Sequence, residues 1–295
     1  MHGSLRQNKG ITLIELLVAL VIAGILVAAV YRTFLSQQKT YTVQEQVVDM
    51  QQNVRALINR MMREIRMAGF GNVSMLLPPP YGLGPGVTIG GKNYTDVVNP
   101  DYPVAGSVTI LSGICFYYIN GSGEKVVVST TEVPVVPNQI KVNSLTDTQG
   151  NVLFDTGDRK YVSIGGVESY TITNIVGTTL TLSGNLTYSH PVNTPVFAIR
   201  AISYQVGIVD GKPTLLRDEN TGAGGQSLAD NIETLQFGYL DANGNPTANP
   251  PGIRIVQVTL RATTNDSDPE YKSDGGYRKR TIASNVRLRN MGLEL

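Results

Sequence analysis

The feature that most constrains this chain is an apolar run from Ile11 to Val30, in which Glu15 is the only charged residue. As a helix, a run of about 20 residues is roughly 30 Å long, which matches the hydrocarbon core of a membrane. The sequence therefore predicts a membrane-spanning helix over 11–30. Because a carboxylate is costly inside such a segment, Glu15 is expected to have a functional role.

Two ordinary interpretations explain this run less well. A secretory signal peptide has a shorter apolar region that ends at a small-residue cleavage site. Here the run continues into Tyr31-Arg32-Thr33-Phe34 without a turn signal. A simple membrane anchor explains neither Glu15 nor the glycine, Gly10, that stands directly before the run. The length of the apolar run and its uninterrupted continuation favour a segment that is not cleaved off behind Val30.

The string Gly10-Ile11-Thr12-Leu13-Ile14-Glu15 resembles the cleavage and methylation motif of type IV prepilins and type II secretion pseudopilins. The resemblance implies that a prepilin peptidase/N-methyltransferase cuts between Gly10 and Ile11, removes the leader 1–10 and methylates Ile11. Most family members have phenylalanine at this position, so Ile11 is a mild departure. Arg6 and Lys9 would keep the leader in the cytoplasm, by the positive-inside rule.

Glu15 is the predicted assembly residue. Cleavage would create an ammonium at Ile11, and a carboxylate in a low-dielectric medium is attracted to such a charge. The ammonium of the same chain lies at helical spacing, and that of a neighbouring subunit is the partner that the resemblance implies. In a third interpretation, Glu15 reaches the lipid headgroups and only favours the positive end of the helix dipole.

The helix is expected to continue beyond the membrane over 31–69. No proline or glycine occurs from Tyr31 to Ala68, and residues that favour helices predominate. Apolar residues recur there at helical spacing: Val47, Met50, Val54, Leu57, Met61 and Ala68. Gly69 and Gly71 predict the end of the helix. We therefore expect one helix from Ile11 to Ala68 whose second, amphipathic half packs on a soluble domain.

The remainder of the chain predicts a β-rich head. Residues 70–105 are rich in glycine and proline and are expected to form a surface connection. Short strands separated by turns are expected over 106–295: 108–119, 125–133, 169–175, 178–182, 196–209, 232–240, 253–264 and 278–290. The predicted fold class is α+β, with a long N-terminal helix packed on a head of antiparallel sheets.

The last third of the chain resembles PilW-type minor pilins, and the J-type pseudopilin of type II secretion has a related layout. The motifs that carry this second resemblance are Leu228-Ala229-Asp230-Asn231-Ile232-Glu233, Gln236-Phe237-Gly238-Tyr239-Leu240-Asp241, Ile253-Arg254-Ile255-Val256 and Asn285-Val286-Arg287-Leu288-Arg289-Asn290.

No constellation of catalytic residues is recognisable, so the chain is not expected to be an enzyme or to hold a cofactor. The segment from Gly86 to Asn93 nearly spells a phosphate-binding loop, but Asn93 replaces the required hydroxyl residue. Cys115 and His190 are too few for a zinc site, so no metal site is predicted. We interpret His190 as a loop residue, and Cys115 as a small buried hydrophobic residue.

The charged residues of the head are interpreted as turns and surface ion pairs. Asp241 is expected in a hairpin turn. The cluster Asp266, Asp268, Glu270 and Asp274 is expected to be a solvated loop, with calcium binding as the alternative. Basic residues gather near the C-terminus: Arg278, Lys279, Arg280, Arg287 and Arg289. Since the net charge is only +1, a nucleic-acid partner is not expected.

These features predict a minor pilin that helps to initiate or cap a type IV pilus. Its expected partners are the prepilin peptidase, other major and minor pilins and the inner membrane. The head would lie in the periplasm before assembly, and the protein would join a pilus or pseudopilus afterwards. The alternatives are a type II secretion pseudopilin and a binding module, an adhesin or DNA receptor, that the pilus carries.

Overall fold

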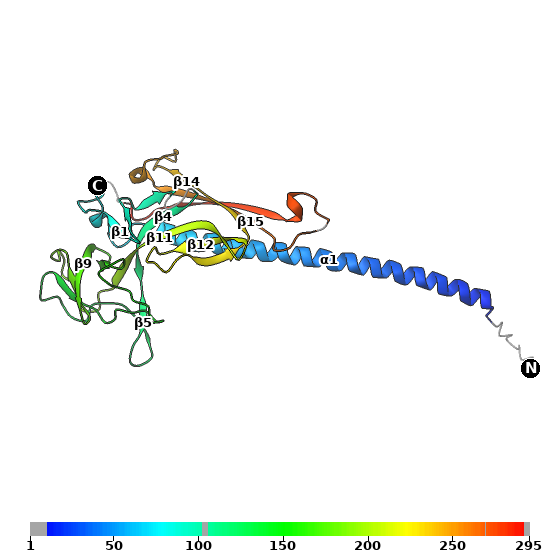
Figure 1. Cartoon of the computed structure of the whole chain (residues 1–295), viewed down its shortest axis with the longest axis horizontal. Helices are drawn as coiled ribbons and strands as arrows, with labels where there is room; N and C mark the ends of the chain where they lie inside the picture. Colours follow the sequence, from blue (N-terminus) through cyan, green and yellow to red (C-terminus); the bar gives the residue numbers. More distant parts are fainter. Residues whose placement is uncertain (1–10, 102–105, 269, 292–295) are drawn as a thin grey trace, which may run out of the picture.

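A computed structural model describes residues 11–101, 106–268 and 270–291 of the chain. One long helix, α1 (Leu13–Arg66), projects from a head built of strands, as Figure 1 shows. The strands pair in antiparallel fashion, which confirms the predicted α+β class. The predicted leader 1–10, with Gly10, lies outside the described residues.

The first half of α1 is exposed along its whole length. It is long and apolar enough to cross a membrane, with a mean hydropathy of 2.9 over its most apolar stretch, and none of that stretch is buried within the molecule. The second half packs on the head through the predicted apolar stripe. Met50, Val54, Leu57 and Met61 are buried, and Val47 packs against the same core.

The end of the helix depends on a glycine, as the sequence predicts. Gly69 adopts a positive φ of 80°, and its N–H donates a hydrogen bond to the carbonyl of Leu111 at 2.8 Å. A Cβ on Gly69 would lie 2.4 Å from the carbonyl oxygen of Asn290. Glycine is therefore needed both for the backbone conformation and for the close approach of the C-terminal segment.

In the described part of the chain, the strands form four antiparallel sheets. The largest has the order β13-β12-β11-β8-β9-β10-β7, and β4 pairs with β11 and with β3. A three-stranded sheet has the order β14-β15-β16, and the pairs β1-β2 and β5-β6 form two hairpins.

The bounds of these strands, in chain order, are β1 (Val87–Ile89), β2 (Lys92–Tyr94), β3 (Val98–Pro100), β4 (Val108–Cys115), β5 (Tyr117–Ile119), β6 (Lys125–Val127), β7 (Gln139–Lys141), β8 (Tyr161–Ile164), β9 (Glu168–Val176), β10 (Thr179–Leu182), β11 (Val196–Val209), β12 (Lys212–Asp218), β13 (Gln226–Asp230), β14 (Ile232–Leu240), β15 (Ile255–Thr263) and β16 (Lys279–Arg287). Short 3-10 turns occur at η1 (Val73–Leu76), η2 (Pro250–Gly252) and η3 (Asp274–Gly276).

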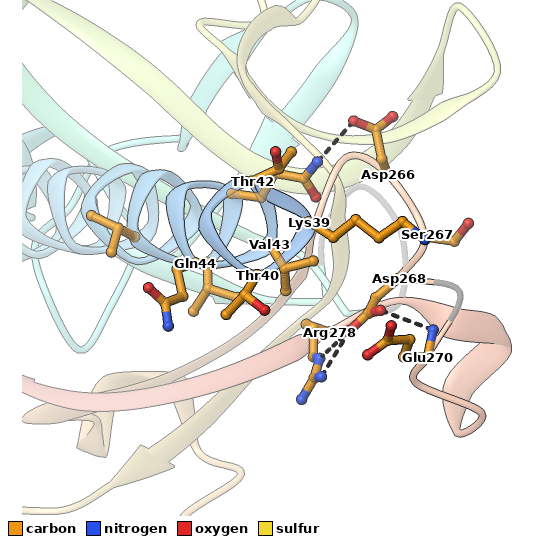
Figure 2. Close-up of a pocket in the computed structure, with 13 residues that line it drawn as sticks. Lys39, Thr40, Thr42, Val43, Gln44, Asp266, Ser267, Asp268, Glu270 and Arg278 are labelled. Atoms are coloured by element: carbon orange, nitrogen blue, oxygen red, sulfur yellow. Dashed lines mark hydrogen bonds and ion pairs between the residues drawn. The ribbon is translucent and has the colours of Figure 1, made fainter. Parts of the chain in front are cut away.

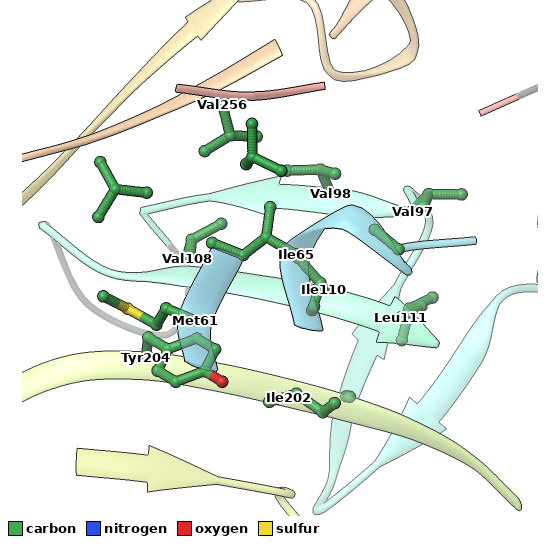
Figure 3. Packing of buried hydrophobic residues seen from close by; sticks show 14 of the residues in the cluster. Met61, Ile65, Val97, Val98, Val108, Ile110, Leu111, Ile202, Tyr204 and Val256 are labelled. Atoms are coloured by element: carbon green, nitrogen blue, oxygen red, sulfur yellow. The ribbon is translucent and has the colours of Figure 1, made fainter. Parts of the chain in front are cut away.

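Strand β11 connects two clusters of buried residues. The larger cluster lies between α1 and strands of both main sheets; Figure 3 shows Met61 and Ile65 of the helix beside Ile110 and Tyr204. The smaller cluster is built from β7–β10 and the start of β11, and we call this part of the head the outer lobe. The helix therefore contacts the inner part of the head, while the outer lobe has a core of its own.

Several expectations are wrong in detail; the predicted strand 125–133, for example, is a strand only over Lys125–Val127. Residues 70–101 are not a surface connection: they form η1 and β1–β3, and Val87, Val97 and Val98 are buried because they pack in the same cluster as the apolar residues of α1 and β4. The predicted strand 108–119 is two strands of different sheets, β4 and β5, which separate at Phe116. Cys115 is half-buried and not fully buried as expected. This partial burial raises the pKa of its thiol.

Candidate assembly site at the start of the long helix

The start of α1 is held by a reciprocal pair of hydrogen-bonding residues, Thr12 and Glu15. Thr12 is the N-cap, and its hydroxyl accepts a hydrogen bond from the Glu15 N–H at 3.3 Å. In return, the Glu15 carboxylate accepts bonds from the Thr12 N–H at 2.8 Å and from its hydroxyl at 2.9 Å. This capping box satisfies two of the amide groups that a helix start leaves unpaired.

The capping box directs the Glu15 carboxylate towards the chain's own start. Ile11 is one residue before the amide that Glu15 holds, which corresponds to about 3.8 Å of backbone. An ammonium created at Ile11 would therefore lie within reach of this carboxylate. Sequence reasoning did not single out Thr12, although the spacing Thr12-x-x-Glu15 is a known signal for this arrangement.

The surface around this site is apolar and uncovered. Ile11 is 78% exposed, and Leu13, Ile14, Leu16 and Leu17 are exposed as well. Such a surface is stable only in lipid or against other apolar helices. A carboxylate in that setting would gain strongly from an ammonium partner on a neighbouring helix.

At the other end of α1, a partly buried ionic network fixes the helix to the sheet. One carboxylate oxygen of Glu64 accepts a hydrogen bond from the Tyr204 hydroxyl at 2.6 Å. The same oxygen forms an ion pair with Arg217 at 2.9 Å. Arg217 also pairs with Glu219 at 2.9 Å, and Arg200 lies 3.8 Å from Glu219. The network joins α1 to β11 and β12, so a displacement of the helix would be transmitted to the head.

The phosphate-loop lookalike at Gly86–Asn93 is a β-hairpin. Its strands β1 and β2 pair antiparallel from Val87–Tyr94 to Ile89–Lys92. Gly90 and Gly91 form the turn with positive φ values of 58° and 72°. In a phosphate-binding loop this stretch would instead join a strand to a helix.

His190 lies in the connection before β11, as predicted, but it is buried and paired. Its ring nitrogen Nε2 contacts the carboxylate of Glu168 on β9. That carboxylate also accepts hydrogen bonds from Tyr170 at 2.6 Å and from the Thr187 N–H at 2.8 Å. Although burial alone would raise it, these bonds hold the pKa of Glu168 below its usual value. The cluster fastens the loop 183–195 to the outer lobe.

Two of the four acidic residues of the C-terminal cluster, Asp268 and Asp274, form ion pairs with basic residues. Asp268 pairs with Arg278 at 2.8 Å, while Asp274 lies 3.2 Å from Lys279 and 3.6 Å from Arg261. No group of three or more metal-ligating side chains is found within 11–101, 106–268 and 270–291. In the other predicted turn, the Asp241 carboxylate accepts bonds from the N–H groups of Asn243 and Asn245.

Comparison with known protein families decides the class of the N-terminal segment. Residues 5–31 match the family model of the prokaryotic N-terminal methylation motif. The chain carries a pilin-type leader motif. This finding supports the prepilin and pseudopilin class, with processing by a prepilin peptidase and assembly with other pilins in general. No curated protein and no solved structure is significantly similar to the chain.

The motif covers the residues of this candidate site and indicates the class of processing that they would undergo. The matched segment contains Gly10, Ile11, Thr12 and Glu15, together with the apolar first part of α1. A pilin-type motif combined with an apolar helix of this length points to membrane anchoring. Cleavage between Gly10 and Ile11, methylation of Ile11 and the assembly role of Glu15 remain predictions.

Proposed function

We propose that this protein is a minor pilin: a structural subunit that, after leader cleavage and N-methylation at Ile11, helps to initiate or cap a type IV pilus. The observation that carries the proposal is the capping box of Thr12 and Glu15 at the start of an exposed apolar helix. The proposed activity is assembly, not catalysis.

In the proposed mechanism, Glu15 changes partner. Before assembly, its carboxylate is held by Thr12 and by the ammonium of its own Ile11. On docking, the ammonium of a neighbouring subunit competes for the same carboxylate, in a medium where opposite charges attract strongly. The apolar residues around the site then pack against the neighbour's helix, and the head is carried along because the second half of α1 is part of its core.

The first test measures the intact mass and N-terminal sequence of the membrane-extracted protein, with and without the prepilin peptidase. A chain that starts at N-methylated Ile11 only when the peptidase is present supports the proposal. A start at Met1, or a cleavage behind Val30, contradicts it.

A second test separates processing from assembly. Glu15→Gln should be cleaved normally but should fail to enter filaments, because the amide keeps the shape of the side chain and removes its charge. Asp49→Gln, an exposed acidic residue further along the same helix, is the matched control. Loss of pili in a deletion strain favours the minor pilin, whereas loss of protein secretion alone favours the pseudopilin subtype. A head that binds a glycan or DNA with micromolar affinity, in a strain that still makes pili, favours the binding module.

A further inference from the structure

Strand β16 forms one edge of the sheet β14-β15-β16. It pairs with β15 along its whole length, from Ile255–Arg287 to Thr263–Lys279, without a shift of register. Within the described part of the chain, no strand pairs with its other side. β16 is therefore a regular edge strand of nine residues.

Two hydrogen bonds beyond the ends of β16 show which of its backbone groups point away from β15. The Thr264 N–H donates to the carbonyl of Arg278 at 2.9 Å, and the Leu288 N–H donates to the carbonyl of Arg254 at 2.9 Å. Because antiparallel strands bond through alternate residues, the even-numbered residues of β16 bond to β15. The N–H and C=O groups of the odd-numbered residues therefore point to the open side: Lys279, Thr281, Ala283, Asn285 and Arg287.

The middle of this open side has no partner. Among the described residues, none forms a hydrogen bond with the outward backbone groups of Thr281, Ala283 or Asn285. Helix α1 packs against β15 and β16, and it supplies one bond on this side, from the Arg289 N–H to the Arg66 carbonyl at 3.2 Å, beyond the end of the strand. The side chains of Thr281, Ala283 and Asn285 are exposed as well. Such a row of unpaired donors and acceptors is a template for one more strand.

Both edges of the largest sheet, in contrast, are protected against such pairing. β13 has only five residues, and its pairing with β12 shifts register after Leu215. β7 has only three residues, and a neighbouring segment covers it, because Thr130 bridges Val142 and the Thr131 N–H donates to the carbonyl of Lys141. Short strands, bulges and covering segments are the usual means of blocking an edge. β16 has none of them, and this difference singles it out as the edge on which a partner can add a strand.

The charges of β16 indicate which kind of strand fits. Arg278, directly before the strand, is neutralised by Asp268 at 2.8 Å, as Figure 2 shows. Arg280 and Arg287 are exposed, and neither forms an ion pair with any residue that the structure describes. The residues between these two arginines are uncharged. A strand that carries carboxylates near both of its ends is therefore complementary to β16.

A second copy of β16 is not complementary in this way. Two copies paired antiparallel over their whole length, about Ala283, would place Lys279 of each copy opposite Arg287 of the other. Like charges directly opposite one another destabilise a sheet. The complementary strand therefore belongs to a different protein.

We propose that the open side of β16 binds an extended, acidic segment of another protein, which adds a fourth strand to the sheet. The outward backbone groups of Thr281, Ala283 and Asn285 bond to this strand, and Arg280 and Arg287 select for its carboxylates. This inference goes beyond the proposed function, because it concerns the head and holds whether or not the helix enters a filament.

A synthetic peptide tests the proposal. It has ten residues, valine and threonine in alternation, with glutamates at the second and ninth positions, which are as far apart as Arg280 and Arg287. Its binding to the full chain in detergent is measured by the fluorescence anisotropy of an attached dye, and we expect a dissociation constant below about 1 mM. Two control peptides should each bind about tenfold more weakly or worse. One has methylated backbone nitrogens and cannot add to a sheet, and the other has lysines in place of the glutamates.

Variants of the chain test the strand itself. Ala283→Pro removes an outward N–H but no bond to β15, because a proline is tolerated on an edge strand where its nitrogen faces away from the sheet. It should abolish binding. Arg287→Glu should weaken binding of the glutamate peptide and strengthen binding of the lysine peptide, each about tenfold. Lys125→Glu, on β6 of a different sheet, is the matched control and should change neither affinity. Urea unfolding shows whether each variant is folded, and Arg287→Glu decides the question if Ala283→Pro is not.

Three outcomes overturn the inference: no saturable binding up to about 1 mM peptide, equal binding of the peptide with methylated nitrogens, or an unchanged affinity in Arg287→Glu. Self-association of the chain that Ala283→Pro abolishes would identify a second copy as the occupant and would overturn it too. These results are independent of the proposed function, which the intact mass and N-terminal sequence test separately.

Discussion

Glu64 offers the sharpest test of how the helix is fixed to the head. Its carboxylate accepts bonds from the fully buried Tyr204 and from Arg217, whose side chain is only 8% exposed. Although burial alone would lower it, Glu64 and Glu219 hold the pKa of Arg217 above its usual range, so the guanidinium stays charged. Glu64→Ala therefore leaves a buried hydroxyl unpaired and removes one of the two carboxylates next to a buried charge.

The expected loss of stability is about 3 kcal/mol. An unsatisfied buried hydroxyl costs about 1–3 kcal/mol, and breaking a buried ion pair costs about 3–5 kcal/mol. The second cost is only partly incurred, because Glu219 remains 2.9 Å from Arg217. Double-mutant analysis with Tyr204→Phe should give a coupling energy of about 1–2 kcal/mol, since the two residues share a direct hydrogen bond.

The assay is urea unfolding of the full chain in detergent, followed by tyrosine fluorescence, because the chain has 14 tyrosines and no tryptophan. The urea concentration at the midpoint of unfolding should be lower by about 1 M or more in Glu64→Ala. Arg60→Ala is the control: Arg60 lies 3.6 Å from Glu64 and is exposed, so its removal should cost less than about 1 kcal/mol. If the free energy of unfolding of Glu64→Ala lies within about 0.5 kcal/mol of that of the unchanged protein, the network does not hold the helix.

Two further substitutions test other parts of the head. Glu168→Gln should destabilise it by about 2–4 kcal/mol near neutral pH. Because the folded-state pKa of Glu168 is lowered, its stabilisation is present above the usual carboxyl value of 4.5 and is lost as the pH falls through the folded value. Urea midpoints measured across that range should therefore depend less on pH in the variant, and an unchanged pH dependence would contradict the assignment. Gly69→Ala should cost more than Gly91→Ala in the same assay, because both have positive φ but only Gly69 would clash with Asn290. Equal losses of stability in the two variants would mean that the close approach of Asn290 to Gly69 does not contribute.

Much of the helix could be predicted from the sequence because local chemistry determines it. Three signals of the helix depend only on residues that are close together in the sequence. They are the apolar run, the stripe from Val47 to Ala68 and the stop at Gly69. The fold class followed from short alternating strands separated by turns. The strands β11 and β14 also agree with their expected ranges.

The rest depended on contacts between distant parts of the chain. Glu168 and His190 lie on different segments, and only the folded outer lobe brings them together. The valines of residues 70–101 are buried in the cluster that also contains α1, β4 and β11, and their local composition does not reveal these distant partners. Glycine and proline marked the turns there correctly, but a turn can lie inside the head as well as on its surface.

The separation between the two ends of α1 limits how assembly can affect the head. From Glu15 to Glu64 the helix rises about 74 Å. Charges interact through salt solution over only about 8 Å, so a new partner at Glu15 cannot alter the Glu64 network electrostatically. Only a displacement of the helix can carry the signal, and it must act through the buried stripe and the ion pair between Glu64 and Arg217 of β12. Sites this far apart, with no shared partners, should have additive effects on stability. A filament defect in Glu15→Gln with a fully stable head therefore reports on assembly, whereas the same defect in Glu64→Ala reports on the joint between helix and head.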